Sequence, residues 1–268
     1  MIITFLTDFG LQDDFVGTCH GVIARIAPDA RVIDVTHGVR PGRVLQGALV
    51  LANTLPYMPV GVHLAVVDPG VGSSRRALAL RDGEGRLYVG PDNGLLLPAA
   101  ERCGGVAAAH ELANAEYSLQ PVSRTFHGRD LFSPAAAHLA AGVALEDLGP
   151  PVDPDQLVRL ELPEPEVGHN RIRALAMVVD RFGNVSLNLR REHLEHAELA
   201  AGTRIELSCH GERFYAVAAR TFADAPRGSL ILFEDSYGSL ALAVSRGSAA
   251  QLLRLEEGGE IVLDLANR

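Results

Sequence analysis

A carboxylate and two guanidinium groups flank a tight turn in the first third of the chain. The apolar run from Val62 to Val67 is followed by Asp68, then by a turn rich in Gly and Ser, and then by Arg75 and Arg76. A guanidinium can hold a carboxylate ionised and oriented, and glycines let the backbone between them turn sharply. Because ligands bind at the carboxyl ends of strands in open α/β sheets, Asp68 with Arg75 is a candidate catalytic pair. A structural ion pair at a strand end fits this spacing equally well.

Further acid and base candidates stand in two other polar segments. His127 precedes an apolar run, where a histidine can be a general base or simply a cap and packing residue. Asp8, Asp13 and Asp14 follow the first β-rich run. Acids in such a loop bind ribose hydroxyls or magnesium, or cap the next helix. Asp14 is expected to be the cap, and Asp8 is the better ligand candidate.

The absence of several residue types and motifs excludes several kinds of catalytic chemistry. All 24 residues in the Lys and Arg total are arginine, which excludes Schiff-base chemistry, a lysine base and the P-loop lysine. No G-x-S-x-G elbow occurs, and none of the 3 cysteines lies in a nucleophile signature. His193 and His196, flanked by glutamates, favour a solvated helix face, and the other histidines lack metal-ligand spacing. We therefore expect no metal and no cofactor.

Charge and hydropathy restrict the partners. The formal charge of −9 and the lack of a basic block argue against nucleic acid or an anionic membrane as partner. No window approaches 18 uninterrupted apolar residues, and the N-terminus lacks the basic region of a signal peptide. The few, widely spaced cysteines suit a reducing compartment. These features together predict a soluble cytoplasmic protein.

The sequence pattern of the first half of the chain predicts alternating strands and helices. Apolar periodicity predicts strands over 2–7, 31–35 and 63–67, separated by helices over 15–27 and 41–55. This order predicts a mainly parallel sheet with helices on its faces. The segments 77–81 and 86–90 then read as a β-hairpin, and His127 leads into an Ala-rich helix over 131–141.

A passage rich in proline separates this half from a second, mostly β, segment. Prolines 150, 151, 154, 163 and 165 mark the best candidate for a domain boundary, which divides the chain into domains 1–162 and 170–268. Short strands at close spacing after this boundary predict a small barrel or sandwich, interrupted by one helix around 191–199.

Six motifs, taken together in their order, carry a family resemblance. They are Thr7-Asp8-Phe9-Gly10 with Asp13-Asp14, Val67-Asp68-Pro69-Gly70-Val71-Gly72 with Arg75, Pro91-Asp92-Asn93-Gly94, Phe126-His127-Gly128-Arg129-Asp130, Asp180-Arg181-Phe182-Gly183-Asn184 and Ser236-Tyr237-Gly238. The chain resembles the S-adenosyl-L-methionine (SAM) hydroxide adenosyltransferases, the adenosine-forming SAM hydrolases, which are related to the fluorinases and chlorinases. The resemblance implies a Rossmann-like α/β sandwich domain followed by a C-terminal β-barrel domain. It also implies a homotrimer that binds SAM between the N-terminal domain of one subunit and the C-terminal domain of its neighbour.

The same resemblance implies a reaction and the residues that carry it. Water attacks C5′ of the ribose of SAM, which gives adenosine and L-methionine. The family's Asp-Arg-His triad corresponds to Asp68, Arg75 and His127. The implied substrate contacts are Asp8 on the ribose diol, Asp180 and Ser236 on the methionine amino acid group, Asn184 on the adenine edge, and Phe222 stacked on the ring. Asp13 is a further implied substrate contact.

Two other activities remain open beside hydrolysis. The first is halide-dependent adenosyl transfer, as in a chlorinase. The related halogenases carry Tyr at the position that corresponds to Asp68. A carboxylate beside the attacking position would repel a halide, whereas it accepts a hydrogen bond from water. A non-catalytic SAM- or adenosine-binding protein would not need a water-activating group, so the resemblance favours the hydrolase.

Overall fold

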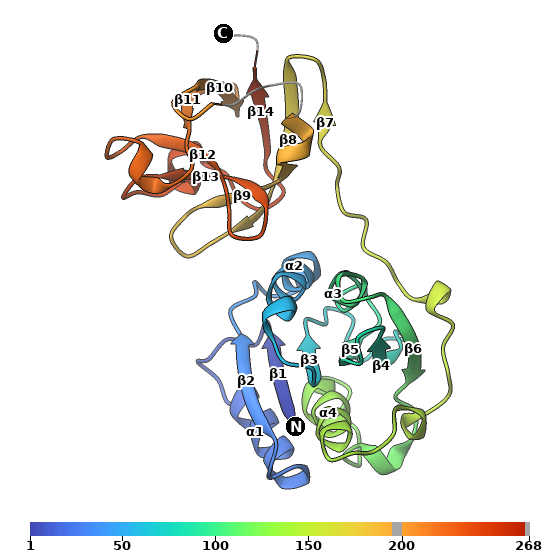
Figure 1. Ribbon diagram of the computed structural model, residues 1–268. Coiled ribbons are helices and arrows are strands. Elements are labelled where there is room, and N and C mark those ends of the chain that lie inside the picture. The colour runs from blue at the N-terminus through green and yellow to red at the C-terminus, as the bar shows by residue number, and fades with distance from the viewer. Residues whose placement is uncertain (195–199, 266–268) are drawn as a thin grey trace. The chain divides into compact units, whose positions relative to one another are not determined.

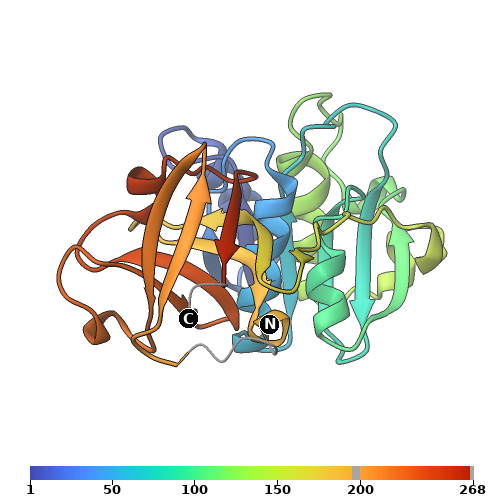
Figure 2. The ribbon, with the colours of Figure 1, turned by 90° about the horizontal axis from the view of Figure 1, so that it is seen from above.

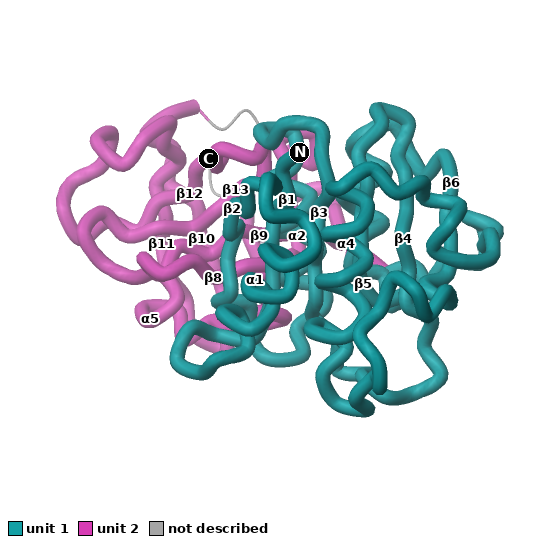
Figure 3. The backbone as a smooth tube through the Cα atoms, turned by 90° about the horizontal axis from the view of Figure 1, so that it is seen from below, with its two compact units in different colours: residues 1–160 teal, residues 161–268 magenta. Residues whose placement is uncertain are grey.

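The protein consists of two compact units. The structure, a computed structural model, describes residues 1–194 and 200–265. The first unit spans Met1–Leu160, and the second comprises residues 161–268 (Figure 3). Within the described residues, no helix has both the length and the apolar character needed to cross a membrane.

A six-stranded sheet forms the centre of the first unit, in the order β2-β1-β3-β5-β4-β6 (Figure 1). Its strands are β1 (Ile2–Thr7), β2 (Arg31–Thr36), β3 (Val62–Val66), β4 (Ala77–Asp82), β5 (Leu87–Pro91) and β6 (Val106–Glu111). Strands β2, β1, β3 and β5 run parallel, whereas β4 is antiparallel to both of its neighbours. The predicted parallel core and the predicted β4–β5 hairpin are both confirmed.

Helices cover both faces of this sheet. They are α1 (Phe15–Ile26), α2 (Val44–Thr54), α3 (Leu97–Arg102) and α4 (Ser133–Ala140). Because side chains alternate along a strand, neighbouring residues of β1 enter different cores. Phe5 packs in the core that includes α1 and α4, and Leu6 packs in the core that includes α2 and α3. The unit is therefore a three-layer α/β/α sandwich, which confirms the predicted fold class.

Two helices begin later than the sequence predicts. The helix expected from residue 41 begins at Val44, because Gly42 has a φ of +72° and turns the chain before the helix starts. The helix expected from residue 131 begins at Ser133 and follows a π-helical turn, Gly128–Phe132. Short 3₁₀ turns also occur in both units, at Leu55–Tyr57, Ala115–Tyr117, Leu145–Leu148, Pro154–Gln156, Arg191–Leu194 and Phe222–Asp224.

The second unit contains a closed seven-stranded barrel. Its strands follow the order β14-β10-β11-β12-β13-β9-β8, and β14 pairs again with β8 to close the ring (Figure 1). Figure 2 shows the same strands from above. The strands are β7 (Glu166–Val167), β8 (Arg171–Val179), β9 (Val185–Arg190), β10 (Arg204–Cys209), β11 (Glu212–Ala218), β12 (Leu230–Glu234), β13 (Ser239–Val244) and β14 (Glu260–Asp264), with one short helix, α5 (Ala249–Leu253). Strand β7 pairs with β8 outside the ring. Of the two predicted alternatives, the structure shows a barrel.

Alternating side chains fill the barrel. In β8, Ile172, Ala174 and Ala176 point into the core, whereas Arg171, at the start of the strand, and Arg173 are exposed. The helix predicted around 191–199 begins as the 3₁₀ turn Arg191–Leu194, and its remaining residues, 195–199, lie outside the described part of the chain.

Candidate active site

Two carboxylates meet at the carboxyl edge of the parallel strands. Strands β1 and β3 are neighbours, and their register pairs Thr7 with Val66. Asp8 follows Thr7, and Asp68 follows β3 after a single intervening residue, Val67. Burial raises the pKa of Asp8, and the negative charge of Asp68 raises it further. This edge of the sheet therefore carries the polar cluster expected from the sequence.

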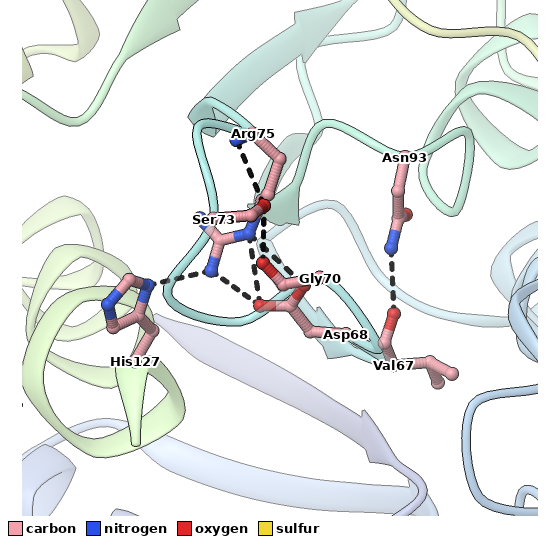
Figure 4. A network of polar contacts seen from close by, with 7 residues as sticks. All are labelled: Val67, Asp68, Gly70, Ser73, Arg75, Asn93 and His127. Carbon is pink, nitrogen blue, oxygen red and sulfur yellow. Dashed lines mark hydrogen bonds and ion pairs between the residues drawn. The ribbon is translucent and has the colours of Figure 1, made fainter. Parts of the chain in front are cut away.

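Asp68 and Arg75 form a bidentate ion pair across the turn between them (Figure 4). The Arg75 Nε donates to both carboxylate oxygens at 3.1 Å, and Nη2 donates to Oδ2 at 2.5 Å. The two side chains are only 5% and 10% exposed, so water screens this contact weakly. The carboxylate of Asp68 is thus fixed in orientation.

Glycine shapes the turn that closes this pair. Gly72 has a φ of +79°, and a Cβ built on it would lie 2.4 Å from the carbonyl oxygen of Arg124. Only glycine fits a position with this conformation and this close approach. The Ser73 hydroxyl and amide both donate to the carbonyl of Gly70, which tightens the same turn. Gly72 therefore sets the geometry that brings Arg75 back onto Asp68.

His127 joins the pair through Arg75. The Arg75 Nη2 lies 2.7 Å from Nδ1 of His127 (Figure 4). Arginine has only donors, so Nδ1 must accept, and the proton of the neutral imidazole then lies on Nε2. Burial and the charge of Arg75 lower the pKa of His127, which favours this neutral form. The structure thus brings together the three residues predicted as catalytic, with Arg75 in the middle.

Aromatic packing positions His127. It precedes the π-helical turn that leads into α4, and the ring of Phe126 packs edge-on against Phe9. Gly128 is buried, and a Cβ at this position would lie 2.9 Å from Cζ of Phe9. The Arg75 guanidinium lies over the Phe132 ring at 5.1 Å. A larger residue at 128 would have to displace Phe9 from this cluster.

The remaining predicted residues of the first unit differ in their surroundings. Asp8 is half-buried, and its Oδ2 accepts a 2.8 Å hydrogen bond from the amide of Gly42. Asp13 is exposed in the loop before α1. Asp14 takes the predicted N-cap position, but its carboxylate makes no cap hydrogen bond and instead accepts from the Thr18 hydroxyl. Asp8 is thus the acid of this loop that the fold holds in place.

Asn93 supports the site in a way that the sequence alone did not reveal. Its turn signature favours a structural role, yet its side chain donates to the carbonyl of Val67 at 2.9 Å (Figure 4). The neighbouring Asp92 forms an ion pair with Arg76 at 2.7 Å. The Asp-Asn pair after β5 therefore braces both ends of the 67–76 turn. The only sequence signal was its place at the carboxyl end of a parallel strand.

Four predicted substrate contacts lie on loops of the second unit. Asp180 and Asn184 meet in the β8–β9 loop, where Asn184 Nδ2 donates to Asp180 Oδ2 at 2.7 Å. Phe222 is 48% exposed in the 3₁₀ turn after β11 and packs against Phe233. Ser236 lies in the β12–β13 turn. Their roles as substrate contacts stay predictions.

Comparison with known proteins assigns the chain to a family. Models of the SAM hydroxide adenosyltransferase N-terminal and C-terminal domains match residues 3–149 and 176–262. The chain is 52% identical to a protein of Salinispora arenicola named (R)-S-adenosyl-L-methionine hydrolase, over 97% of this chain and 96% of that relative. It is 30% identical to a fluorinase of Nocardia brasiliensis, over 96% of this chain and 94% of the relative.

A solved structure has the same fold. An uncharacterized conserved protein from Thermotoga maritima superposes with a TM-score of 0.90 at 38% identity, covering 98% of this chain and 99% of that one. Both family domains and the whole fold are therefore matched in order. The chain belongs to the SAM hydroxide adenosyltransferase family.

Proposed function

We propose that this protein hydrolyses S-adenosyl-L-methionine to adenosine and L-methionine. The observation that carries the proposal is the bridge of Arg75 between Asp68 and His127 at the edge that also carries Asp8. The identity of 52% to a relative named as an (R)-SAM hydrolase supports the choice of substrate and reaction.

The reaction suits a site built from these side chains. The oxygen of water forms a bond to C5′ while the C5′–S bond breaks, and its electron pair stays on sulfur. The leaving group, L-methionine, therefore departs from the sulfonium as a neutral thioether, so it needs neither a general acid nor a Lewis acid. The site has to hold one water in line with the C5′–S bond and accept its proton. We therefore propose that no metal or cofactor takes part.

The hydrogen bonds suggest how the triad divides this task. The Nδ1 lone pair of His127 is occupied by Arg75, so the proton of the neutral ring lies on Nε2. We propose that this Nε2–H donates to the water oxygen. The carboxylate of Asp68 retains acceptor capacity beyond its bonds to Arg75, because each oxygen has two lone pairs. Asp68 is therefore the proposed proton acceptor, Arg75 orients it, and His127 positions the water.

The substrate contacts are proposed from the same resemblance. Asp8 would bind the ribose diol, with Asp13 as a further contact. Asp180 and Ser236 would hold the methionine group, Asn184 the adenine edge, and Phe222 the adenine ring. The exposed Phe222 ring and the pre-ordered Asp180–Asn184 loop are consistent with binding roles.

Assembly and location are further parts of the proposal. A homotrimer is expected, and light scattering on the purified protein measures it directly. We place the protein in the cytoplasm, because Cys19, Cys103 and Cys209 are all free and buried, which suits a reducing compartment.

Halide transfer is the nearest competing activity, since fluorinases are among the relatives. The carboxylate of Asp68 argues against it, because a negative charge beside the attacking position repels a halide anion. A pure binding role is also disfavoured, because binding does not require a carboxylate held by a buried guanidinium next to a neutral imidazole.

The deciding experiment incubates the purified protein with SAM and separates the products by chromatography. Each diastereomer at sulfur is supplied separately, because the relative's name specifies the (R) form. Equal amounts of adenosine and methionine are expected. S-adenosylhomocysteine, a chloride-dependent 5′-chloro-5′-deoxyadenosine, or binding without turnover would each overturn the proposal.

A further inference from the structure

Three side chains with metal-binding groups meet in the first unit, outside the Asp68–Arg75–His127 triad. His20 lies on α1, Asp34 on β2, and His37 directly after β2. The Oδ1 of Asp34 lies 2.9 Å from Nε2 of His20 and 3.1 Å from Nε2 of His37. One donor atom from each residue falls within 4.8 Å of the other two.

The inner histidine has a nitrogen without a hydrogen bond. The His37 side chain is 2% exposed, and its Nδ1 pairs with the Thr7 hydroxyl at 2.8 Å. Among the described residues, its buried Nε2 has no hydrogen-bond partner, although Oδ1 of Asp34 is 3.1 Å away. The in-plane direction in which Nε2 can form a hydrogen bond thus does not point at that oxygen. A buried nitrogen in this state is costly unless something else occupies its lone-pair direction.

We propose that His20, Asp34 and His37 bind one divalent transition-metal ion, of which Zn²⁺ is the best match. Zinc takes imidazole nitrogen and carboxylate oxygen at about 2.0 to 2.2 Å, so neighbouring ligand atoms in a tetrahedral site are roughly 3.3 to 3.6 Å apart. The observed separations of 2.9 and 3.1 Å are a few tenths of an ångström shorter, so small shifts of the side chains would bring them to that spacing. An ion on the Nε2 axis of His37, beside rather than on the line to Oδ1, also explains the missing hydrogen bond.

The surroundings of the cluster fit such an ion. The Thr7 contact at Nδ1 fixes the ring of His37 and leaves Nε2 toward the cluster, as outer-sphere partners of metal-bound histidines do. The Phe5 ring packs edge-on against His37, with ring centres 4.9 Å apart, and limits its rotation. The His20 and Asp34 side chains are 36% and 42% exposed, so an ion can enter from solvent and keep a water as its fourth ligand.

The proposed ion would brace the loop that carries Asp8. His37 contacts this loop at two points: its ring pairs with Thr7, and its carbonyl accepts from the amide of Gly10 at 2.8 Å. Asp8 lies between these two residues. Because a ligand that binds only the folded state stabilises it, zinc should raise the melting temperature of the protein. The ion has a structural role in this proposal and takes no part in hydrolysis.

The test is a calorimetric titration of chelator-treated, untagged protein with Zn²⁺. We expect one ion per chain, and His20→Gln and Asp34→Asn should each weaken the affinity by at least about tenfold. His169→Gln, which removes an exposed histidine of the second unit, is the matched control and should leave the affinity unchanged. Thermal melts should show that zinc raises the melting temperature of the wild type and of the control, but not of the two ligand variants.

Cobalt provides a second readout that does not depend on activity. Co²⁺ in place of zinc should give the visible absorption bands of a four-coordinate site in the wild type, and both ligand variants should lose them. No binding to the wild type, or equal affinity in the wild type and His20→Gln, would overturn the proposal. If Asp34→Asn does not fold, His20→Gln decides the test alone. The His20 side chain is partly exposed on α1, so its replacement should not prevent folding. None of these outcomes depends on whether the protein hydrolyses SAM.

Discussion

Arg75 donates to Nδ1 of His127 over 2.7 Å while the same guanidinium nitrogen, Nη2, donates to Asp68. This contact assigns the tautomer of the imidazole, because an arginine cannot accept a hydrogen bond. In the proposed mechanism it makes His127 a donor toward the attacking water and leaves Asp68 as the proton acceptor. The contact therefore separates two roles that the residue types alone could not distinguish.

Asp68→Asn should lower kcat by about 10²- to 10⁴-fold, the usual contribution of a general base. Affinity for SAM should change much less, since the proposed role of Asp68 is to contact the attacking water rather than the substrate body. Single-turnover kinetics and calorimetric binding measure the two quantities separately. A parallel loss of binding and rate would show that Asp68 is a substrate contact.

Substitutions of His127 discriminate between a positioning donor and a base. The amide of Gln can accept from Arg75 through its oxygen and donate through its nitrogen, which reproduces both hydrogen bonds of the neutral imidazole. His127→Gln should therefore keep at least about tenfold more kcat than His127→Ala, since each hydrogen bond to a charged group contributes about 1.5 to 3 kcal/mol. If the two variants are equally inactive, His127 transfers the proton itself.

The pH profile should show the titration of His127. Burial and Arg75 lower its pKa below the ordinary 6.5, so the ring is neutral at neutral pH. As the pH falls through this lowered pKa, the ring gains a proton, Nδ1 can no longer accept from Arg75, and kcat should fall. The same group stabilises the fold fully above pH 6.5, and this stability is lost at lower pH, because the unfolded chain binds the proton first. The acid limb of kcat should be absent in His127→Gln.

Asp8→Ala should weaken the binding of both SAM and adenosine by about tenfold or more, if its carboxylate accepts from the ribose hydroxyls. Asp14→Ala is the matched control in the same loop, because its side chain contacts only the Thr18 hydroxyl among the hydrogen bonds described above. Calorimetry with adenosine measures the effect without turnover. Unchanged affinity in Asp8→Ala would contradict the ribose assignment.

Gly72→Ala should destabilise the protein and reduce kcat together. An alanine at this positive φ lowers the free energy of unfolding by about 1 kcal/mol. The clash of its methyl group with the carbonyl oxygen of Arg124 lowers it by about a further 1 to 3 kcal/mol. Gly85→Ala is the control, since Gly85 has a φ of +86° but open space around its Cβ direction. Chemical denaturation should show a small loss for Gly85→Ala and a larger one for Gly72→Ala. Equal losses would mean that the turn adapts to the new methyl group.

Local patterns were sufficient to predict most of the fold. The buried runs before Asp8 and Asp68 are parallel strands, and the hairpin of β4 and β5 lies where the turn residues predict it. The errors concern where helices begin. Gly42 ends a turn rather than extending α2, because its amide is needed by Asp8, and a contact between residues 34 positions apart is invisible to local periodicity.

The candidate active site could likewise be predicted only in part from local sequence. Asp68 and Arg75 are close in sequence, and glycines between them indicate the turn, so their pairing could be predicted from spacing. His127 is 52 positions from Arg75, and only the resemblance to a family linked the two before the structure was known.

The sequence by itself determined the alternation of strands and helices, the absence of lysine chemistry and the carboxylate at the end of β3, because these depend on residue type and local period. The tertiary structure alone decided which nitrogen of His127 accepts from Arg75 and that His20, Asp34 and His37 meet. These contacts join a helix, a strand and loops whose distances along the chain are unrelated to their distances in space. Because β1 lies between β2 and β3 and pairs parallel with both, the carboxyl ends of these three strands lie at one edge of the sheet.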